Sequence, residues 1–495
     1  MRLAFSWRSR RGLDSAATTA ATAAVLAVLL CSCGTSAAAA SARAARSDAV
    51  KVDQVGYPSS RPKLAVITDA RASGTFSVRR VRDGSEAMSG ALGPARADAD
   101  TGDTVRIADL SAVTDTGSYY VDVAGVGTSD EFDVSPDVYS SAFVLAARAF
   151  YGQRCGTAVD LGPSFPGYRH AACHVAGAPN PDALMHVSSG ATGTIEASGG
   201  WHDAGDYGKY VVNSGISTGE LLWAYEMFPD RVGPVSLSIP ESGNATPDLL
   251  DEARWNLTWM LKMQDADGGV WHKLTSENFG GFVMPEVDDG GPRYVIGTGA
   301  GPYKSSCATA DFAAVMAIAA RVFRTFDPAF AAAAQSAAER AWSWLSRYPN
   351  VTFKNCCGVV TGEYGDGDCS DERLWAAAEL FRTTGGAEYN AYFVSAYAGS
   401  GALVADVPSW QNVRTMALMT YALSRTPGTD ESVRARVRGA LVDSAHAVVA
   451  RAAANPYRVS LRDTDYVWGS NGVAANYGVV LIVANALQPE PAFVD

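Results

Sequence analysis

The pattern of hydrophobic and polar positions divides the chain at about residue 135. Upstream of this point, short β-rich runs lie at 64–67 (LAVI), 75–78 (TFSV) and 118–123 (SYYVDV). Clusters of Gly, Asp and Pro separate these runs, roughly every eight to twelve residues. Short strands at this spacing predict a small antiparallel β-sandwich, which we place at residues 48–135.

Downstream the hydrophobic period becomes helical and stays so to the end of the chain. A helix start is predicted at residues 135–137. Ser135 can cap the helix, Pro136 suits its first turn, and the charge of Asp137 complements the helix dipole. The ranges predicted as helices are 138–151, 211–228, 247–261, 307–325, 329–347, 371–386, 388–399, 411–425, 429–453 and 472–487. We expect no strand between them. Serial helices with long Gly/Asp-rich loops and no repeated motif predict a closed α/α barrel over residues 136–495.

Residues 1–47 have the pattern of a leader. Several Arg residues precede an apolar run over 16–30 and a tract of small residues over 37–45, which is typical of a secretory signal. Ser9, Arg10 and Arg11 resemble a twin-arginine export signal. Cys33 is a candidate for lipid attachment, with secretion free of an anchor as the alternative. No other stretch is long and apolar enough to span a bilayer, so we expect no transmembrane segment.

The charge of the chain restricts its partners. The formal net charge is −12, and it becomes −17 without the leader, which carries six Arg and one Asp. An acidic protein disfavours nucleic acid and anionic membrane surfaces. We therefore expect a monomer whose substrate is neutral.

The stretch with the clearest chemistry is 199–210 (GGWHDAGDYGKY). It places Asp203 and Asp206 three residues apart with only Ala and Gly between them. A carboxylate beside another negative charge is costly unless water or a substrate proton uses it, so such pairs are often acid/base sites. The glycines let a large ligand approach the backbone. The alternative is an ordinary turn, because Asp and Gly are common turn formers.

Segment 200–207 (GWHDAGDY) resembles the signature of the family 9 glycoside hydrolases, mostly cellulases, in the group with an N-terminal immunoglobulin-like domain. Further segments agree with the family in order along the chain: 52–57 (VDQVGY), 151–156 (YGQRCG), 247–252 (PDLLDE), 361–366 (TGEYGD) and 466–471 (YVWGSN). The resemblance implies an (α/α)6 barrel of twelve helices behind a β-sandwich. It also implies inverting hydrolysis of β-1,4-glucan, as in a secreted endo-acting cellulase.

In that scheme Asp206 is the general base that deprotonates the attacking water, and Asp203 helps to hold the water. A Glu on the other side of the sugar protonates the leaving oxygen. In the family this Glu follows the segment equivalent to 466–471 by a long interval, but the only acids after Asn471 are Glu490 and Asp495. Neither lies in a matching motif.

We therefore expect a barrel that is incomplete at its C-terminal end, lacks the catalytic acid and has little hydrolytic activity. The alternatives are an inactive fragment that serves as a glucan-binding or structural module, and another β-glycosidase of the same family.

The cysteines and histidines include a candidate metal site. Cys155, Cys173, His174 and His202 offer two thiolates and two imidazoles, the ligand set of a closed zinc site. The alternative is a Cys155–Cys173 disulfide, which is common in secreted proteins. The resemblance implies zinc, and four protein ligands make it structural because no position stays open for water.

A second candidate metal site lies in the acidic loop after residue 360. Asp366, Asp368 and Asp371, with the carbonyl-rich run 361–367, offer oxygen ligands for calcium. The alternative is a solvated loop that ends in a helix cap. Cys356, Cys357 and Cys369 flank the loop and predict one disulfide across it, with the pairing and the role of Cys307 open.

Aromatic residues near predicted loops are candidates for sugar binding, because the C–H faces of sugars pack on aromatic rings. By resemblance we select Trp271, Trp375 and Tyr466. The alternative for each is ordinary core packing.

Overall fold

The computed structural model describes residues 43–72, 74–163, 165–399 and 407–494. Residues 1–42 of the predicted leader, including Cys33, lie outside the described residues. Export and lipid attachment therefore stay predictions.

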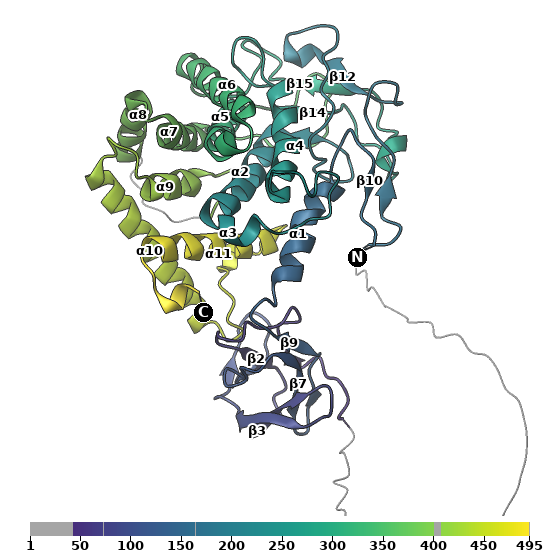
Figure 1. The fold of residues 1–495 in the computed structure, drawn as a ribbon, viewed down its shortest axis with the longest axis vertical. Helices are drawn as coiled ribbons and strands as arrows, with labels where there is room; N and C mark the ends of the chain where they lie inside the picture. Colours follow the sequence, from purple (N-terminus) through teal and green to yellow (C-terminus); the bar gives the residue numbers. More distant parts are fainter. Residues whose placement is uncertain (1–42, 73, 164, 400–406, 495) are drawn as a thin grey trace, which may run out of the picture. The chain divides into compact units, whose positions relative to one another are not determined.

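The N-terminal region is a β-sandwich (Figure 1). One sheet has the order β1-β2-β6-β5 and the other β4-β3-β7-β8, with β9 also paired to β7. The strands are β1 Val50–Lys51, β2 Leu64–Ile67, β3 Thr75–Arg80, β4 Glu86–Ala91, β5 Arg96–Ala97, β6 Thr104–Asp109, β7 Gly117–Val123, β8 Gly127–Thr128 and β9 Phe132–Val134. Phe76 pairs with Val123 and Val78 with Val121 across β3 and β7. All four side chains are buried, so alternate positions of each strand face the core.

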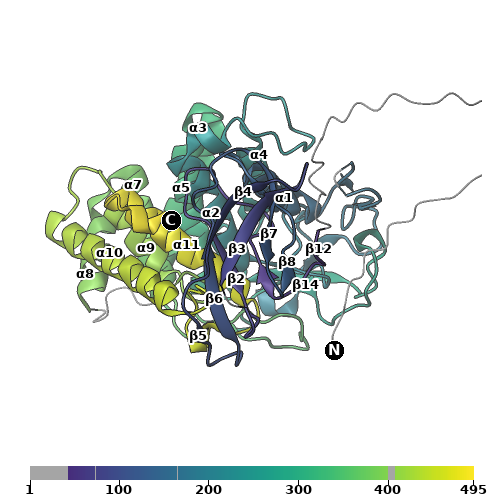
Figure 2. The same ribbon diagram turned by 90° about the horizontal axis from the view of Figure 1, so that it is seen from below.

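The remainder is largely helical. The helices are α1 Ser140–Gly152, α2 Val211–Met227, α3 Pro229–Val232, α4 Asp248–Lys262, α5 Ser306–Val322, α6 Pro328–Arg347, α7 Ser370–Thr384, α8 Ala387–Gly399, α9 Arg414–Leu423, α10 Glu431–Ala454 and α11 Ser470–Leu487. Each range predicted as a helix overlaps one of them, with ends that differ by a few residues, and the short α3 is an addition. At the centre, α5 packs against α2, α6 and α7 (Figures 1 and 2).

Local capping explains several helix boundaries. Asp327 accepts a hydrogen bond from the Phe330 N–H at the start of α6, and Asp430 caps α10 in the same way. The predicted helix start at Ser135 is wrong, because α1 begins at Ser140 without a side-chain cap. The Ser135 N–H donates to the carbonyl of Tyr57, which keeps this segment attached to the sandwich.

By length and composition alone, two helical segments among the described residues could cross a membrane, Ser306–Thr325 and Ser470–Leu487. This corrects the expectation that no stretch beyond the leader qualifies. The first is 94% buried and includes α5, whose many alanines let neighbouring helices approach closely, so it is a core helix. The second is α11, which is only 22% buried and packs against α9 and α10.

The loops between the helices contain strands that the sequence analysis missed. Strands β12 Asp182–Met185, β13 Lys209–Tyr210, β14 Lys273–Ser276 and β15 Arg293–Ile296 form a sheet with the order β12-β15-β14-β13. Another pair joins β10 Val159–Asp160 to β11 Arg169–His170. Strands of two to four residues are too short to give a period-2 pattern. The sheet fixes the loop that carries the two motif carboxylates, because β13 follows that loop directly.

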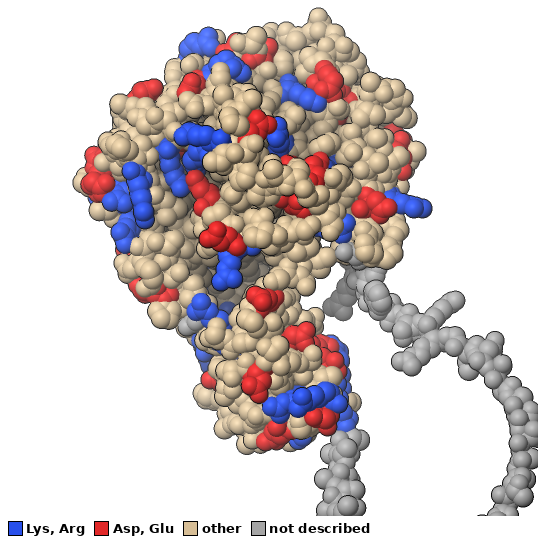
Figure 3. Space-filling view, viewed as in Figure 1, with Lys and Arg blue, Asp and Glu red and all other residues tan. Residues whose placement is uncertain are grey.

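Charged side chains of both signs are interspersed on the face shown in Figure 3. Among the described residues visible there, neither sign forms a continuous patch. Attraction of a charged polymer by electrostatics alone requires a patch of one sign, so this face does not favour such a ligand.

Candidate active site

Residues 199–210 form the loop that carries both motif carboxylates. The backbone at Gly200 has φ 75°, and a Cβ there would lie 2.7 Å from the ring of Trp259. Only glycine fits this position, because both the conformation and the contact exclude a side chain. The loop therefore passes directly over the core before it turns outward.

Asp203 is exposed on this loop and is held by neutral donors. Its N–H donates to the Gly208 carbonyl at 2.8 Å, which closes the loop. Asn213 donates to one carboxylate oxygen and the Tyr364 hydroxyl to the other, both at 2.7 Å. Partial burial raises the pKa of Asp203 and the charge of Asp206 raises it further, whereas the two hydrogen bonds oppose the shift.

Asp206 is half-buried and accepts from the Tyr210 hydroxyl at 2.8 Å and from the Gly208 N–H at 3.4 Å. Burial raises the pKa of Tyr210, and the charge of Asp206 raises it further, so the phenol stays a hydrogen-bond donor. In the part of the chain that the structure describes, neither Asp203 nor Asp206 forms an ion pair. Each carboxylate therefore keeps acceptor capacity for water or substrate.

A buried ammonium supports the segment that carries Tyr364. Lys273 donates to the Gly362 carbonyl at 2.7 Å and to oxygens of Asn355 and Thr361. Burial lowers the pKa of Lys273 to about 7. These bonds fix the backbone two residues before Tyr364, so Lys273 positions the hydroxyl that contacts Asp203.

A cavity of about 160 Å³ opens beside Asp203. Its walls include Trp201, Tyr210, Asn213, Ser214 and Ser217. A water needs roughly 10–15 Å³ of such volume, so several waters fit next to the carboxylate.

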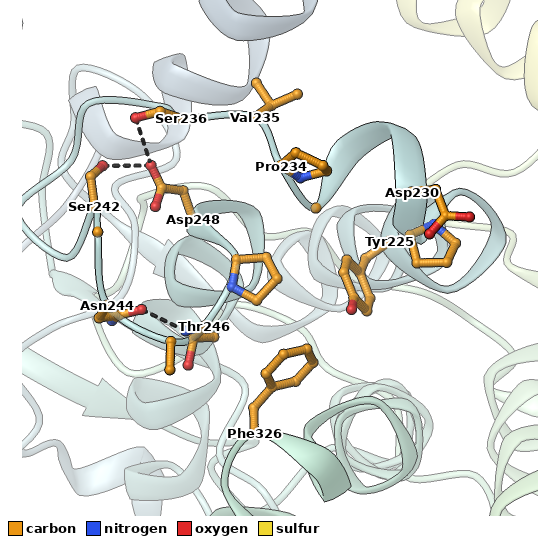
Figure 4. Close-up of a pocket in the computed structure, with 15 residues that line it drawn as sticks. Tyr225, Asp230, Pro234, Val235, Ser236, Ser242, Asn244, Thr246, Asp248 and Phe326 are labelled. Atoms are coloured by element: carbon orange, nitrogen blue, oxygen red, sulfur yellow. Dashed lines mark hydrogen bonds between the residues drawn. The ribbon is translucent and has the colours of Figure 1, made fainter.

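A larger hollow of about 840 Å³ lies elsewhere, at the ends of α2 and α3 (Figure 4). The Tyr225 and Phe326 rings meet edge to face beside it, with centroids 5.9 Å apart. In Figure 4, Ser236 and Ser242 converge on Asp248, and both hydroxyls donate to its carboxylate. Asp248 is therefore occupied in bracing this loop, and the hollow does not contain the motif acids.

The four predicted zinc ligands lie together. Donor atoms of Cys155, Cys173, His174 and His202 all lie within 4.8 Å of one another, and all four residues are buried. The two cysteines are free thiols, so the structure does not contain the alternative disulfide.

The spacing of these donors fits a tetrahedral zinc ion. Cys155 Sγ lies 3.5 Å from His174 Nδ1, and Cys173 Sγ lies 3.7 Å from His202 Nε2. A tetrahedron with ordinary Zn–S and Zn–N bonds has S···N edges of about 3.5 Å.

The groups around the cluster orient its donors. His174 Nε2 lies 3.2 Å from an Asp288 carboxylate oxygen, which leaves Nδ1 directed at the cysteines. A carboxylate behind a histidine is the usual outer partner in zinc sites. Cys155 donates to Asp182 at 3.2 Å. The residues present therefore suit a structural zinc ion, which would brace the loop beside His202.

Comparison with known proteins places the chain among the glycoside hydrolases. Residues 139–495 match Glycosyl hydrolase family 9, and residues 45–128 match the Cellulase N-terminal ig-like domain. The chain belongs to glycosyl hydrolase family 9. It is thus an endoglucanase-like glycoside hydrolase, with an Ig-like β-sandwich followed by a helical (α/α)6-barrel domain, as predicted.

The family members that it resembles include endoglucanases. Endoglucanase D of Acetivibrio thermocellus is 37% identical over 448 residues, which are 90% of this chain and 69% of that protein. A xyloglucan-specific endo-beta-1,4-glucanase of Bacteroides ovatus is 35% identical over 462 residues, covering 88% of this chain and 75% of that protein. The crystal structure of a Zn-binding triple mutant of the family 9 endoglucanase J30 has a TM-score of 0.81 and 35% identity. It covers 88% of this chain and 80% of that one.

Two of the three aromatic residues chosen as sugar platforms lie in the core, which corrects the prediction. Trp375 is fully buried, and its indole N–H donates to Glu379. Trp271 is 5% exposed, and its N–H donates to the Ser189 carbonyl. Both side chains are buried, so neither ring offers an open face to a sugar. Tyr466 is 56% exposed and stays a candidate.

Other aromatic rings lie closer to the acids. Phe282 is fully exposed, and its ring lies 3.8 Å from the position that a Cβ on Gly205 would take. The ring of Trp410 meets Tyr364 edge to face at 5.1 Å. The sequence analysis assigned no role to Phe282, whose only local signal is its position in a glycine-rich loop.

Each of the predicted calcium residues accepts a hydrogen bond from the protein. Asp366 accepts from the Asp368 N–H, Asp368 accepts from Ser370, and Asp371 accepts from the Val413 N–H. Among the described residues, no side chain caps the start of α7, and Asp371 accepts from the distant Val413 N–H, so the structure does not bear out the capping alternative either. The structure adds a buried carboxyl, Asp311, neither of whose oxygens has a hydrogen-bond partner among the described residues. Burial raises the pKa of Asp311, and the charges of Asp371 and Asp366 raise it further. Calcium binding stays a prediction.

The predicted disulfide across the acidic loop is wrong, because Cys369 bonds instead to Cys307, which ties the start of α5 to the start of α7. Cys356 and Cys357, on the same loop, are outside this bond.

Proposed function

We propose that this site hydrolyses β-1,4-glucan with inversion of configuration and that Asp206 is its general base. The observation that supports this most strongly is that Asp203 and Asp206 accept hydrogen bonds from neutral donors only, on an open loop. The endoglucanases among its relatives support the substrate class.

In the proposed mechanism, a water bound between the two carboxylates attacks the anomeric carbon. Asp206 takes the proton of the water as the new C–O bond forms and the glycosidic C–O bond breaks. Asp203, fixed by Asn213 and Tyr364, accepts the other hydrogen of the water and orients it. The leaving oxygen requires a proton from a carboxyl group roughly 6.5–9.5 Å from the base.

We further propose that this carboxyl group is not supplied by the 495 residues of the chain. Among the described residues after Asn471, Glu490 is the acidic residue, and its carboxylate is occupied by His446 at 2.8 Å and Gln488 at 2.6 Å. These hydrogen bonds lower the pKa of Glu490, which disfavours the protonated form that a general acid requires.

A comparison of two substrates tests both parts of the proposal. An aryl cellobioside with a dinitrophenolate leaving group needs no protonation, whereas carboxymethylcellulose does. We expect this chain to cleave the aryl substrate and to be about 10²–10⁴-fold slower on the polymer than an enzyme that has its acid. Asp230→Asn, at the distant hollow, is the matched control and should change neither rate. Cleavage of the polymer at full rate would refute the missing acid, and no cleavage of either substrate would refute the hydrolase.

The second candidate function is a non-catalytic glucan-binding module. Exposed aromatic rings such as Phe282 and Tyr466 favour it, because binding requires stacking but no acid. Under this alternative the chain sediments with insoluble cellulose, and Phe282→Ala releases it, while the aryl substrate stays intact.

We also propose that zinc occupies the Cys/His cluster and stabilises the motif loop. The match of the donor spacings to a tetrahedron supports this, and the related J30 mutant is described as Zn-binding. Cys173→Ser should lower bound zinc, measured by elemental analysis, and lower the unfolding temperature. Cys357→Ser is the control, because Cys357 lies outside the cluster. Purified intact protein without zinc would contradict the proposal.

A further inference from the structure

We propose that Cys356 and Cys357, neighbours in sequence, form a disulfide with each other in the oxidised protein. Their Sγ atoms lie 2.8 Å apart. Non-bonded carbon atoms rest about 3.5–4.0 Å apart, and sulfur is larger than carbon, so this contact is far closer than ordinary packing.

The other cysteines of the described region already have partners. Cys307 and Cys369 form a disulfide, and Cys155 and Cys173 belong to the buried Cys/His cluster. Among the described cysteines, Cys356 and Cys357 therefore have each other as the available disulfide partner.

The backbone is already bent in the way that brings the two sulfurs together. The Val359 N–H donates to the Cys356 carbonyl at 3.0 Å, which closes a four-residue turn. Its central residues, Cys357 and Gly358, have φ of 59° and 96°. Two positive φ angles are typical of a type I′ turn, which glycine, asparagine and aspartate normally occupy. A cysteine is unusual at a position with positive φ, and a covalent bond to its neighbour would explain why Cys357 adopts this conformation.

Gly299, which lies against the two sulfurs, also leaves room for them. A Cβ on Gly299 would lie 2.5 Å from Cys356 Sγ. Gly299 has φ 79°, so both its conformation and this contact require glycine. The sulfur therefore rests directly on backbone, while Cys357 is exposed at the surface.

The position of the turn gives the bond a structural role. Val359 packs with Ile296 and Phe353, and Lys273 holds the backbone of the residues that follow. Tyr364 lies at the far end of this segment, against Asp203. The bond would restrain residues 356 and 357, at the start of the segment that ends at Tyr364. Any effect of the bond on catalysis rests on the proposed function, but formation of the bond does not.

Formation requires a two-electron oxidant. With glutathione disulfide, one thiolate attacks a glutathione sulfur and releases one glutathione thiol. The neighbouring cysteine then displaces the second glutathione, so two protein thiols and one glutathione disulfide give one protein disulfide and two glutathione thiols.

Adjacency also predicts an order of reduction. Neighbouring Cα atoms are about 3.8 Å apart, below the usual 4.4–6.8 Å of a disulfide, and this strain makes the bond more reducible. The Cys307–Cys369 bond spans 4.7 Å between its Cα atoms and is buried. Mild dithiothreitol should therefore open the adjacent pair first.

The test is peptide mapping of the full chain after incubation with glutathione disulfide and alkylation of free thiols. Cleavage after Lys354 and Glu363 separates residues 355–363, with the adjacent pair, from the peptide that carries Cys369. We expect 355–363 to be released alone, unalkylated and two hydrogens lighter than its reduced form. Release in alkylated form, or attachment to the Cys307 peptide, would overturn the proposal.

A variant completes the experiment. In Cys357→Ser, peptide 355–363 should carry one alkyl group or one glutathione at Cys356, because no neighbouring thiol displaces the glutathione, while Cys307 stays joined to Cys369. Because the experiment measures the mass and alkylation of a peptide, its result does not depend on whether the variant is active. An unalkylated Cys356 joined to any other cysteine in this variant would contradict the pairing.

Discussion

Two layers of the molecule use aspartate in opposite ways. Asp182 is fully buried beneath the motif loop and meets the Lys209 ammonium at 2.7 Å and the Arg293 guanidinium at 2.5 Å. Burial alone would raise the pKa of Asp182, but the charges of Arg293 and Lys209 outweigh it and lower the pKa. Asp206, on the loop above, accepts hydrogen bonds from a phenol and a backbone amide and forms no ion pair among the described residues. Its charge acts on the buried Lys273, where it opposes the lowering of the pKa by burial.

The difference separates structural acids from chemical ones. A buried carboxylate with cations on both oxygens is neutralised and cannot take a proton near neutral pH. A carboxylate held by neutral donors is oriented and still basic. Lys209 belongs to the same short stretch as Asp206, so the sequence motif supplies both the base and part of the ionic layer that supports it.

The largest expected effect comes from the upper layer. Asp206→Asn keeps the shape and the acceptor oxygen for Tyr210 but cannot take a proton. We expect aryl cellobioside hydrolysis to fall about 10²–10⁴-fold, measured as kcat, with the unfolding temperature nearly unchanged. An unaltered rate would remove the distinction between the two layers.

The lower layer should respond in stability. Asp182→Asn leaves Lys209 buried without its ion-pair partner and leaves Arg293 with Asp288 at 3.5 Å. Breaking a buried ion pair in this way costs about 3–5 kcal/mol of the free energy of unfolding, which urea titration measures. Asp230→Asn, on the surface, is the control and should cost almost nothing. A loss no larger than that of the control would show that the buried acid is dispensable.

A third carboxyl tests the comparison through pH, because burial is what shifts its pKa. Glu220 Oε1 on α2 is buried without a hydrogen-bond partner among the described residues, and burial raises the pKa of Glu220 from 4.5 to about 7. Between these values the native state holds more protons than the unfolded state, so stability falls as pH rises. Glu220→Gln cannot ionise and should be more stable than wild type at pH 8, by at most about 3 kcal/mol, but not at pH 4. An equal difference at both pH values would contradict the shift.

The smallest expected effect concerns the support of Asp203. Tyr364→Phe removes one neutral hydrogen bond, worth about 0.5–1.5 kcal/mol. We expect kcat to fall about 3–10-fold with KM unchanged, because the bond orients the water and not the sugar. Tyr466→Phe keeps its ring and should leave kcat unchanged. A larger fall in kcat for Tyr466→Phe than for Tyr364→Phe would contradict the role of Tyr364 in holding Asp203.

The parts of the fold that the sequence predicted are those with long periodic patterns. Each range predicted as a helix overlaps one, because a ten- to twenty-residue apolar stripe is a strong signal. The sheet from β12 to β15 was missed, because its strands are too short for a pattern and their partners are distant in sequence.

The same limit applies to the site. Asp203, Asp206 and the Cys/His cluster were found because their motifs are local or chemically distinctive. Asn213 and Lys273 were missed, because only the folded chain brings them to the acids. Trp375 was misplaced, because a helical sequence does not reveal which neighbours cover a ring.

The central claim is that Asp206 directs a water, and does not itself bond to the sugar. The most direct test is to follow the anomeric configuration of the first product by proton NMR during hydrolysis of an activated β-cellobioside. The account predicts that α-cellobiose appears first and then mutarotates. The β anomer as first product would mean a covalent intermediate and would contradict the account.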